Sequence, residues 1–438
     1  MDNMTSAPAV PKKIDSESTE IFDQKSVKKL SFWELLKRIG PGLILCGVVI
    51  GPGAITTAAM LGSSYGYSLV WLLIPVVFMG ITFMLTTYRI TLLTGMPTIH
   101  AIRHYYGKVA AGFVGLATFI ACFFFTIGNV SGTGAGMKLV FRPDWKFGAL
   151  IMIAVLFYCY FAKNVYSKVE KVITVCILGM IIAFYATLVG TGGPDWGQFG
   201  YGLTHWTFPA GSLLAALGFM STHASVTTGV YGTYLGKEKK WKKEDMFNGV
   251  MMADSIAHVG GVVLISGAII LVGAIVLNPT GTAIKGPAQL AEMLVPLMGN
   301  AATYIMGIAL LGAGFSSLLG NTQRAVVLLN AGCDKTTALN HKSIKWGSMI
   351  IIAVCGAIAF LYGGSPTQRI YIANICTSIS TPVAGFFIVR MIWRKDVNEG
   401  LKPPRLLQVC MTVSSLFCVV LTVSSLYSTI ANIISSMA

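Results

Sequence analysis

Stretches of about 20 predominantly apolar residues recur along the chain, and a helix of that length crosses the roughly 30 Å hydrocarbon core of a bilayer. Of the 438 residues, 54% are hydrophobic and only 11% are charged, a balance that excludes a soluble domain of this size. We therefore predict an all-α membrane protein with eleven transmembrane helices. The predicted spans are residues 39–64, 67–94, 109–138, 146–162, 170–190, 206–235, 247–277, 298–331, 343–363, 367–392 and 406–435.

The net charge of +15 would fit a nucleic-acid surface, but its distribution along the chain favours a membrane orientation instead. If the N-terminus lies inside, Lys and Arg collect on the inner side at every connection, as the positive-inside rule requires. The exceptions on the outer side are Lys138, Arg142, Lys146, Lys285 and Arg369. This pattern predicts a multi-pass protein of the cell membrane, with the N-terminus cytoplasmic, the C-terminus outside, the lipid bilayer as its surroundings and no nucleic-acid partner.

The first predicted span is interrupted at its middle by Gly51-Pro52-Gly53-Ala54, followed closely by Thr57. Two glycines around a proline at bilayer depth predict an unwound backbone, which a membrane tolerates only where it is buried in protein or lines a cavity. Broken helices of this kind are typical of secondary transporters. We therefore expect these residues to bind the substrate.

A second interruption is expected five spans later if two inverted repeats build one site between them. The sixth span contains such a polar cluster, and Ser and Thr side chains can satisfy the backbone groups that a break frees. Its candidate substrate-binding residues are Phe219, Met220, Thr222, His223 and Ser225. We predict a disordered cytoplasmic tail (residues 1–30), a ten-helix core (31–393) with repeats at 31–190 and 205–393, and a cytoplasmic linker with the eleventh helix (394–438).

Three short runs in the first two spans resemble the signature of the Nramp divalent-metal transporters. They are Gly40-Pro41-Gly42-Leu43, then Gly51 to Thr57, then Gly66 to Trp71. The resemblance implies the LeuT-like 5+5 inverted-repeat fold with discontinuous first and sixth helices. It also implies Mn²⁺ or Fe²⁺ binding through an Asp and an Asn in the first break, with a Met and a backbone carbonyl in the sixth span.

This chain departs from the family pattern at the residues that carry its chemistry. Gly51 stands at the Asp position and Ala54 at the Asn position, so Met220 is the one side-chain metal ligand that remains. In the third span, Thr126 and Asn129 stand where the family places proton-carrying carboxylates. Without these acids we expect a roomier site, in which the positive ends of the broken helices favour a carboxylate or another anion.

Other polar residues inside predicted spans are candidates for coupling or gating, together with Thr126 and Asn129. Asp254 and His258 are four residues apart and so share one face of the seventh span, where they can hydrogen-bond or exchange a proton. Asn321 in the eighth span and Asn374 in the tenth are candidates for lining the pathway. Arg324 is expected to extend toward the cytoplasmic interface.

The leading functional hypothesis is an Nramp-related secondary transporter that carries a small organic solute, carboxylate-bearing solutes included, by alternating access. The alternative is a divalent metal transporter that moves hydrated Mg²⁺ or Mn²⁺ or a chelated metal. A third class is a membrane sensor that transports nothing. We expect no cofactor and no enzymatic activity, because the sequence has no nucleotide-binding loop, nucleophile elbow or metalloprotease motif. We expect a monomer.

Overall fold

The computed structural model describes residues 27–161, 178–179, 181–361, 369–370, 373, 376–398 and 401–437, and the described part of the chain is helical without a strand. Seven of its helices are long and apolar enough to cross a membrane, or eight when one bent pair is counted as a span. Three shorter apolar helices accompany them, Trp145–Phe161, Ile181–Gly190 and Ser380–Trp393. The all-α class is confirmed, and the count of eleven spans stays a prediction.

The bent pair is the first predicted span. It consists of α2 (Pro41–Val49) and α3 (Pro52–Tyr65), whose axes differ by 63°. Each helix has proline at its first position, where the missing N–H removes no hydrogen bond. Gly51 between them is extended. The predicted break in the first span is therefore confirmed.

The remaining helices follow the predicted order, with boundary differences of a few residues. Before the bent pair lies α1 (Phe32–Arg38). After it come η1 (Val70–Leu72), α4 (Leu73–Thr94), α5 (Thr98–Phe141), α6 (Trp145–Phe161), α8 (Trp196–Thr204), α9 (Leu213–His223), α10 (Val226–Glu238), η2 (Lys243–Met246), α11 (Val250–Val272), the π-helical η3 (Gly273–Leu277), α12 (Pro287–Glu292), α13 (Val295–Met298), η4 (Gly299–Ala301), α14 (Ala302–Gly332), α15 (Lys342–Leu361), η5 (Thr377–Ile379), α17 (Ser380–Trp393) and α18 (Arg405–Met437).

The predicted start of the third span at residue 109 lies just after a kink. Helix α5 begins at Thr98, but Gly107 inside it has φ +87°, and the part of the helix after Gly107 agrees with the prediction. One predicted boundary was wrong. In the sixth span, residues 206–212 are not part of α9, which begins at Leu213. The helix then stops at His223, and Ala224 and Ser225 are non-helical before α10 begins at Val226. The interruption predicted for this span is present.

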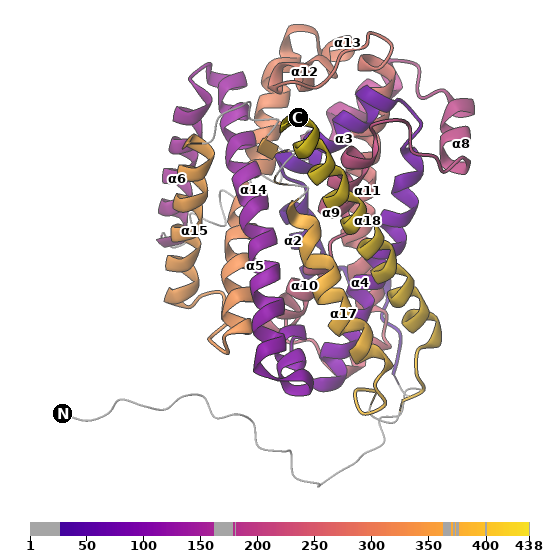
Figure 1. Cartoon of the computed structure of the whole chain (residues 1–438), viewed down its shortest axis with the longest axis vertical. Coiled ribbons are helices and arrows are strands. Elements are labelled where there is room, and N and C mark those ends of the chain that lie inside the picture. Colours follow the sequence, from indigo (N-terminus) through magenta and orange to yellow (C-terminus); the bar gives the residue numbers. More distant parts are fainter. Residues whose placement is uncertain are drawn as a thin grey trace, which may run out of the picture.

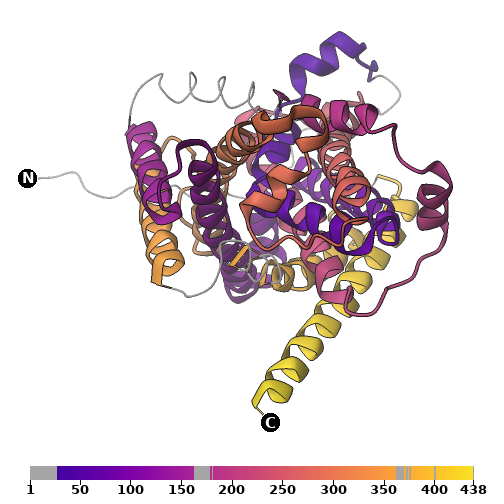
Figure 2. The same cartoon turned by 90° about the horizontal axis from the view of Figure 1, so that it is seen from above.

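Helices α5 and α14 pack along each other through the middle of the bundle, with α6 and α15 side by side at one edge (Figure 1). Glycines allow this close approach, since a Cβ at Gly115 would come within 2.8 Å of the Gly332 Cα atom. Helix α3 packs equally closely on α11, where a Cβ at Gly62 would lie 2.1 Å from the Ile270 carbonyl oxygen. Seen from above, α18 extends outward from the bundle toward its C-terminal end (Figure 2).

These contacts place both helix breaks inside the bundle. Helix α3 packs against α5, α9 and α11, and α2 packs against α10, α11 and α14. The divisions predicted at residues 31–190, 205–393 and 394–438 stay predictions, as do the membrane sides of the two termini. Most of the predicted tail lies outside the described residues.

Candidate functional site

The carbonyl groups at the end of α2 are the first component of the site. Breaking a helix leaves its last carbonyls without partners in the next turn, and here α14 supplies them. The Ser317 hydroxyl donates to the Val48 oxygen at 2.7 Å, and the Asn321 amide donates to the same oxygen at 3.1 Å. The Ser316 hydroxyl donates to the Gly47 oxygen at 3.1 Å. The predicted pathway residue Asn321 therefore touches the break directly.

Asn129 on α5 closes the break from the other side. It is fully buried, its amide donates to the Ser317 hydroxyl at 2.7 Å, and its Oδ1 atom has no hydrogen-bond partner. A Cβ at Gly51 would lie 2.7 Å from that Oδ1 atom and 2.6 Å from the Ser317 Oγ atom. The expectation of a roomier site was wrong at this position, because Asn129 and Ser317 fill the space that a side chain at residue 51 would need.

The rest of the first break is buried and tied to its own helix. Pro52, Gly53 and Ala54 are all buried. The Thr57 hydroxyl donates to the carbonyl oxygens of Gly53 at 3.0 Å and Ala54 at 3.1 Å. Thr57, the one polar candidate on α3, therefore bonds within the first turn of its own helix, and its hydroxyl hydrogen is already donated to backbone oxygens.

At the second break, His223 is held from three directions. Its Nε2 atom lies 2.7 Å from the Ser266 hydroxyl, its Nδ1 atom lies 2.8 Å from the Phe219 oxygen, and its ring stacks on Phe219 with centroids 4.1 Å apart. Ser225 is the N-cap of α10 and accepts from the Thr227 amide. Met220 is buried and lines a small cavity of about 20 Å³.

The remaining coupling candidates divide into three cases. The Thr126 hydroxyl donates to the Cys122 carbonyl oxygen at 2.8 Å, an ordinary contact within α5. Asp254 and His258 are both buried, and no hydrogen bond among the described residues joins them. Asn374 lies outside the described residues. Their predicted coupling roles stay untested.

Asp254 and Asp245 instead hold the segment that leads into α2, and we call these two carboxylates the acidic clamp. Asp254 on α11 accepts from the backbone amides of Gly40 at 3.0 Å and Gly42 at 2.9 Å. The Tyr88 hydroxyl donates to its second oxygen at 2.9 Å. A backbone position that approaches this closely must be glycine, since a Cβ at Gly42 would lie 2.1 Å from the Asp254 carbonyl oxygen.

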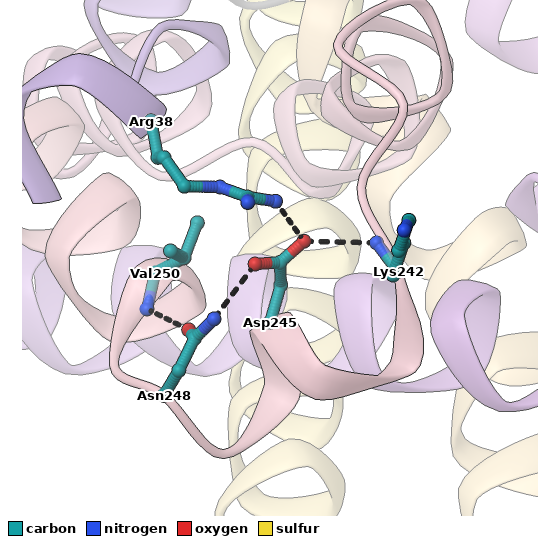
Figure 3. A network of polar contacts seen from close by, with 5 residues as sticks. All are labelled: Arg38, Lys242, Asp245, Asn248 and Val250. Carbon is teal, nitrogen blue, oxygen red and sulfur yellow. Dashed lines mark hydrogen bonds and ion pairs between the residues drawn. The ribbon is translucent and has the colours of Figure 1, made fainter. Parts of the chain in front are cut away.

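The second clamp carboxylate joins α1 to the connection between α10 and α11 (Figure 3). Asp245 is 1% exposed and pairs with the Arg38 guanidinium at 2.5 Å. It also accepts from the Lys242 amide at 2.8 Å and from the Asn248 side chain at 2.8 Å. Both clamp carboxylates are thus fully engaged by donors.

Arg324 on α14 is the residue that the sequence interpretation misplaced. It does not reach an interface, because it is 5% exposed and lines a cavity of about 10 Å³ at the second break. A sequence signal for this position exists. Ser317, Asn321 and Arg324 recur at spacings of four and three residues and so share one helix face. Since Asn321 faces the break, Arg324 is expected on the same side.

A larger cavity of about 510 Å³ runs beside α2. It is lined mainly by apolar residues, with Gly47 and Val48 from α2 and Ser316, Gly320 and Gln323 from α14. It therefore reaches the residues that complete the broken end of α2. A group of three or more His, Cys, Asp or Glu side chains that could hold a metal ion does not occur among the described residues.

Two broken helices that meet inside an apolar bundle, with buried polar side chains at both breaks, define a membrane transporter with a LeuT-like fold. Comparison with known proteins agrees with that class. The family model for natural resistance-associated macrophage protein-like proteins (Nramp) matches residues 42–428. The chain therefore belongs to the Nramp family, whose members are transporters and not enzymes.

Relatives in sequence and in structure are consistent with this assignment. The chain is 24% identical over 386 residues to the divalent metal cation transporter MntH of Agrobacterium fabrum, which covers 85% of this chain and 83% of that protein. A mutant of the Eremococcus coleocola manganese transporter superposes with a TM-score of 0.71 at 17% identity, covering 94% of this chain and 92% of the other. The structure of MhsT in complex with L-phenylalanine superposes with a TM-score of 0.59 at 14% identity, covering 91% of this chain and 99% of the other.

Proposed function

We propose that the protein is a secondary transporter that moves a divalent metal ion by alternating access, with the ion kept in a partial water shell or in a small organic chelator. The choice of a metal is supported by the relatives, which are named as divalent metal cation and manganese transporters. They favour this alternative over the free organic solute expected from the sequence. The observation that carries the retained shell is the chemistry of the groups beside Gly51, which are the neutral amide of Asn129 and the hydroxyl of Ser317 rather than carboxylates.

The donor atoms at the breaks fit a shielded ion better than a bare one. Next to Gly51, the available groups are neutral oxygens, and the Oδ1 atoms of Asn129 and Asn321 are buried without a hydrogen-bond partner. Hard cations take oxygen ligands, and Mg²⁺ keeps several of its waters when few carboxylates are offered. Neutral amide and hydroxyl groups can hold such an ion through its water or chelator, whereas stripping the ion would require anionic ligands.

A free organic solute remains the second candidate because of two observations. MhsT, which shares the fold, is seen in complex with L-phenylalanine. Arg324 also adds a positive charge at the second break, which a carboxylate-bearing solute would balance. We further propose a cell-membrane location, a cytoplasmic N-terminus, an external C-terminus and a monomer, supported by the distribution of Lys and Arg.

Uptake by proteoliposomes tests the proposal. We expect saturable uptake of Mn²⁺ or Mg²⁺, supplied as the aqueous ion or with citrate, and a loss of about tenfold in Asn129→Ala, which removes a buried polar contact at the break. Thr118→Val is the matched control, because Thr118 is a buried residue of the same helix that bonds only within α5. The proposal is overturned if folded wild-type protein takes up neither ion in either form.

A further inference from the structure

The small cavity at the second break is bounded by hydrogen-bond donors from three elements. Helix α10 contributes its N-terminal residues, α9 its last turn, and η5 contributes Thr377, whose hydroxyl donates to the Ser221 Oγ atom at 3.1 Å. The hydroxyl-bearing lining residues are Ser221, Thr222, Ser225, Thr227, Thr228 and Thr377. The cavity also touches Val49, the last residue of α2, so it adjoins the first break.

Arg324 is the one charged residue that lines this cavity. Its Nε atom lies 3.1 Å from the Cys122 Sγ atom, a weak acceptor, and its Nη1 atom is buried without a hydrogen-bond partner. It takes part in none of the ion pairs found among the described residues. Burying a guanidinium without a counter-charge costs free energy. Arg324 therefore occupies a position where an anionic partner would be stabilising.

The other groups at the cavity add to the positive potential. Helix α10 has 13 residues and begins at Val226 with Ser225 as its N-cap, and residues of its first turn line the cavity, so its N-terminal amides and its dipole point toward the cavity. Neither clamp carboxylate lines this cavity, and both are engaged elsewhere, with Asp254 bound to Gly40, Gly42 and Tyr88 and Asp245 bound to Arg38. Most of the lining hydroxyls already bond to each other or to backbone oxygens. The guanidinium of Arg324 and the α10 N-terminus therefore supply the positive charge and the unmatched donor that an oxyanion would bind.

We propose that Arg324 and the α10 N-terminus form an oxyanion subsite that takes a carboxylate group. The inference rests on the proposed function in that the carboxylate belongs to the chelator that travels with the metal ion. The ion itself is repelled by Arg324 and lies toward the neutral oxygens of Asn129 and Asn321. The cavity of about 10 Å³ holds no more than one water, so the carboxylate enters when the break between α9 and α10 widens.

Calorimetric titration of the full-length protein with Mn²⁺, citrate, preformed Mn–citrate, phosphate and chloride tests the subsite. We expect citrate or its complex to bind wild type, and Arg324→Met to weaken that binding about tenfold, the usual scale for losing a charged hydrogen bond. Arg324→Lys keeps the charge but loses the planar fork, so its affinity for citrate should lie between those of wild type and Arg324→Met. Thr228→Val, at the cavity wall, should weaken citrate binding by a smaller factor.

Arg89 provides a matched control, because it is also largely buried, has an unpartnered Nε atom and does not line this cavity. Arg89→Met should leave citrate affinity unchanged. If Arg324→Met does not fold, Arg324→Lys and Thr228→Val carry the test. Unchanged citrate affinity in folded Arg324 and Thr228 variants overturns the carboxylate subsite. The subsite is also overturned if the wild-type protein binds phosphate or chloride but does not bind citrate.

The two proposals fail in different ways. Saturable Mn²⁺ uptake by a protein that binds no carboxylate overturns the oxyanion subsite and leaves metal transport standing. Arg324-dependent binding of citrate by a protein that moves no metal supports the subsite and overturns the proposed cargo.

Discussion

The acidic clamp and the cavity at the second break both contain buried charge, but they treat it in opposite ways. The Asp254 carboxylate accepts three hydrogen bonds and the Asp245 carboxylate also accepts three, so each charge is balanced where it lies. Arg324 has a sulfur neighbour and an unpartnered nitrogen. Buried charge that only builds structure is normally fully bonded. The contrast favours a structural role for the clamp, and the position of Arg324 at a cavity beside the α10 N-terminus supports the ligand subsite proposed there.

Removing the clamp at Asp254 should have the largest effect on stability. Asp254→Ala leaves three donors without an acceptor, namely the part-buried amide of Gly40 and the buried Gly42 amide and Tyr88 hydroxyl. At about 1–3 kcal/mol for each unsatisfied group, we expect a loss of at least about 3 kcal/mol, measured as a lower denaturation midpoint in detergent. Asp254→Asn, which keeps acceptor oxygen, should lose less.

The same variants test whether Asp254 has a structural role. If Asp254→Asn keeps wild-type stability but abolishes metal uptake, Asp254 is a coupling residue, as predicted from its spacing with His258, rather than a structural clamp.

A side chain at Gly51 should have the next largest effect. Gly51→Ala places a Cβ within 2.6 Å of the Ser317 Oγ atom and 2.7 Å of the Asn129 Oδ1 atom. Overpacking of this kind costs about 1–3 kcal/mol, and the thermal midpoint should fall accordingly. Gly260→Ala in α11 is the matched control, because a Cβ there meets nothing within 4 Å. A Gly51→Ala protein as stable as Gly260→Ala would contradict the filled break.

The smallest effect is expected at the exposed half of the clamp. Arg38 is 41% exposed whereas Asp245 is 1% exposed. Arg38→Gln removes a partly solvated ion pair, which contributes about 0.2–1 kcal/mol. Asp245→Ala also frees the Lys242 amide and the Asn248 side chain, so its loss should be larger. Chemical denaturation of the two variants checks the order, and equal losses would contradict it.

The sequence predicted the helical class, the order of the helices and the position of both breaks, because these depend on local features. Proline and glycine at bilayer depth interrupt a helix wherever the rest of the bundle lies. The prediction failed where a side chain's surroundings come from other helices. The open space expected at Gly51 is filled by residues of α5 and α14, and neither could be placed against it from its own segment.

The surroundings of Arg324 also come from other helices, and here a side chain expected at the membrane interface is buried instead. Its place near the end of a predicted span favoured an interfacial side chain, but the packing of α5 and α10 on α14 encloses it. The helix face shared by Ser317, Asn321 and Arg324 predicts a buried position for Arg324 only when Asn321 is known to touch the first break, and that contact comes from the packing of α14 on α2.

The central claim is that the metal ion crosses the protein within its own shell, and X-ray absorption spectroscopy of bound Mn²⁺ tests it most directly. The account predicts a shell of about six oxygen neighbours, as octahedral Mn²⁺ in water, amide and carboxylate surroundings has, unchanged by Met220→Ala. A sulfur neighbour that disappears in Met220→Ala would show that the ion is stripped and bound directly, which would contradict the account.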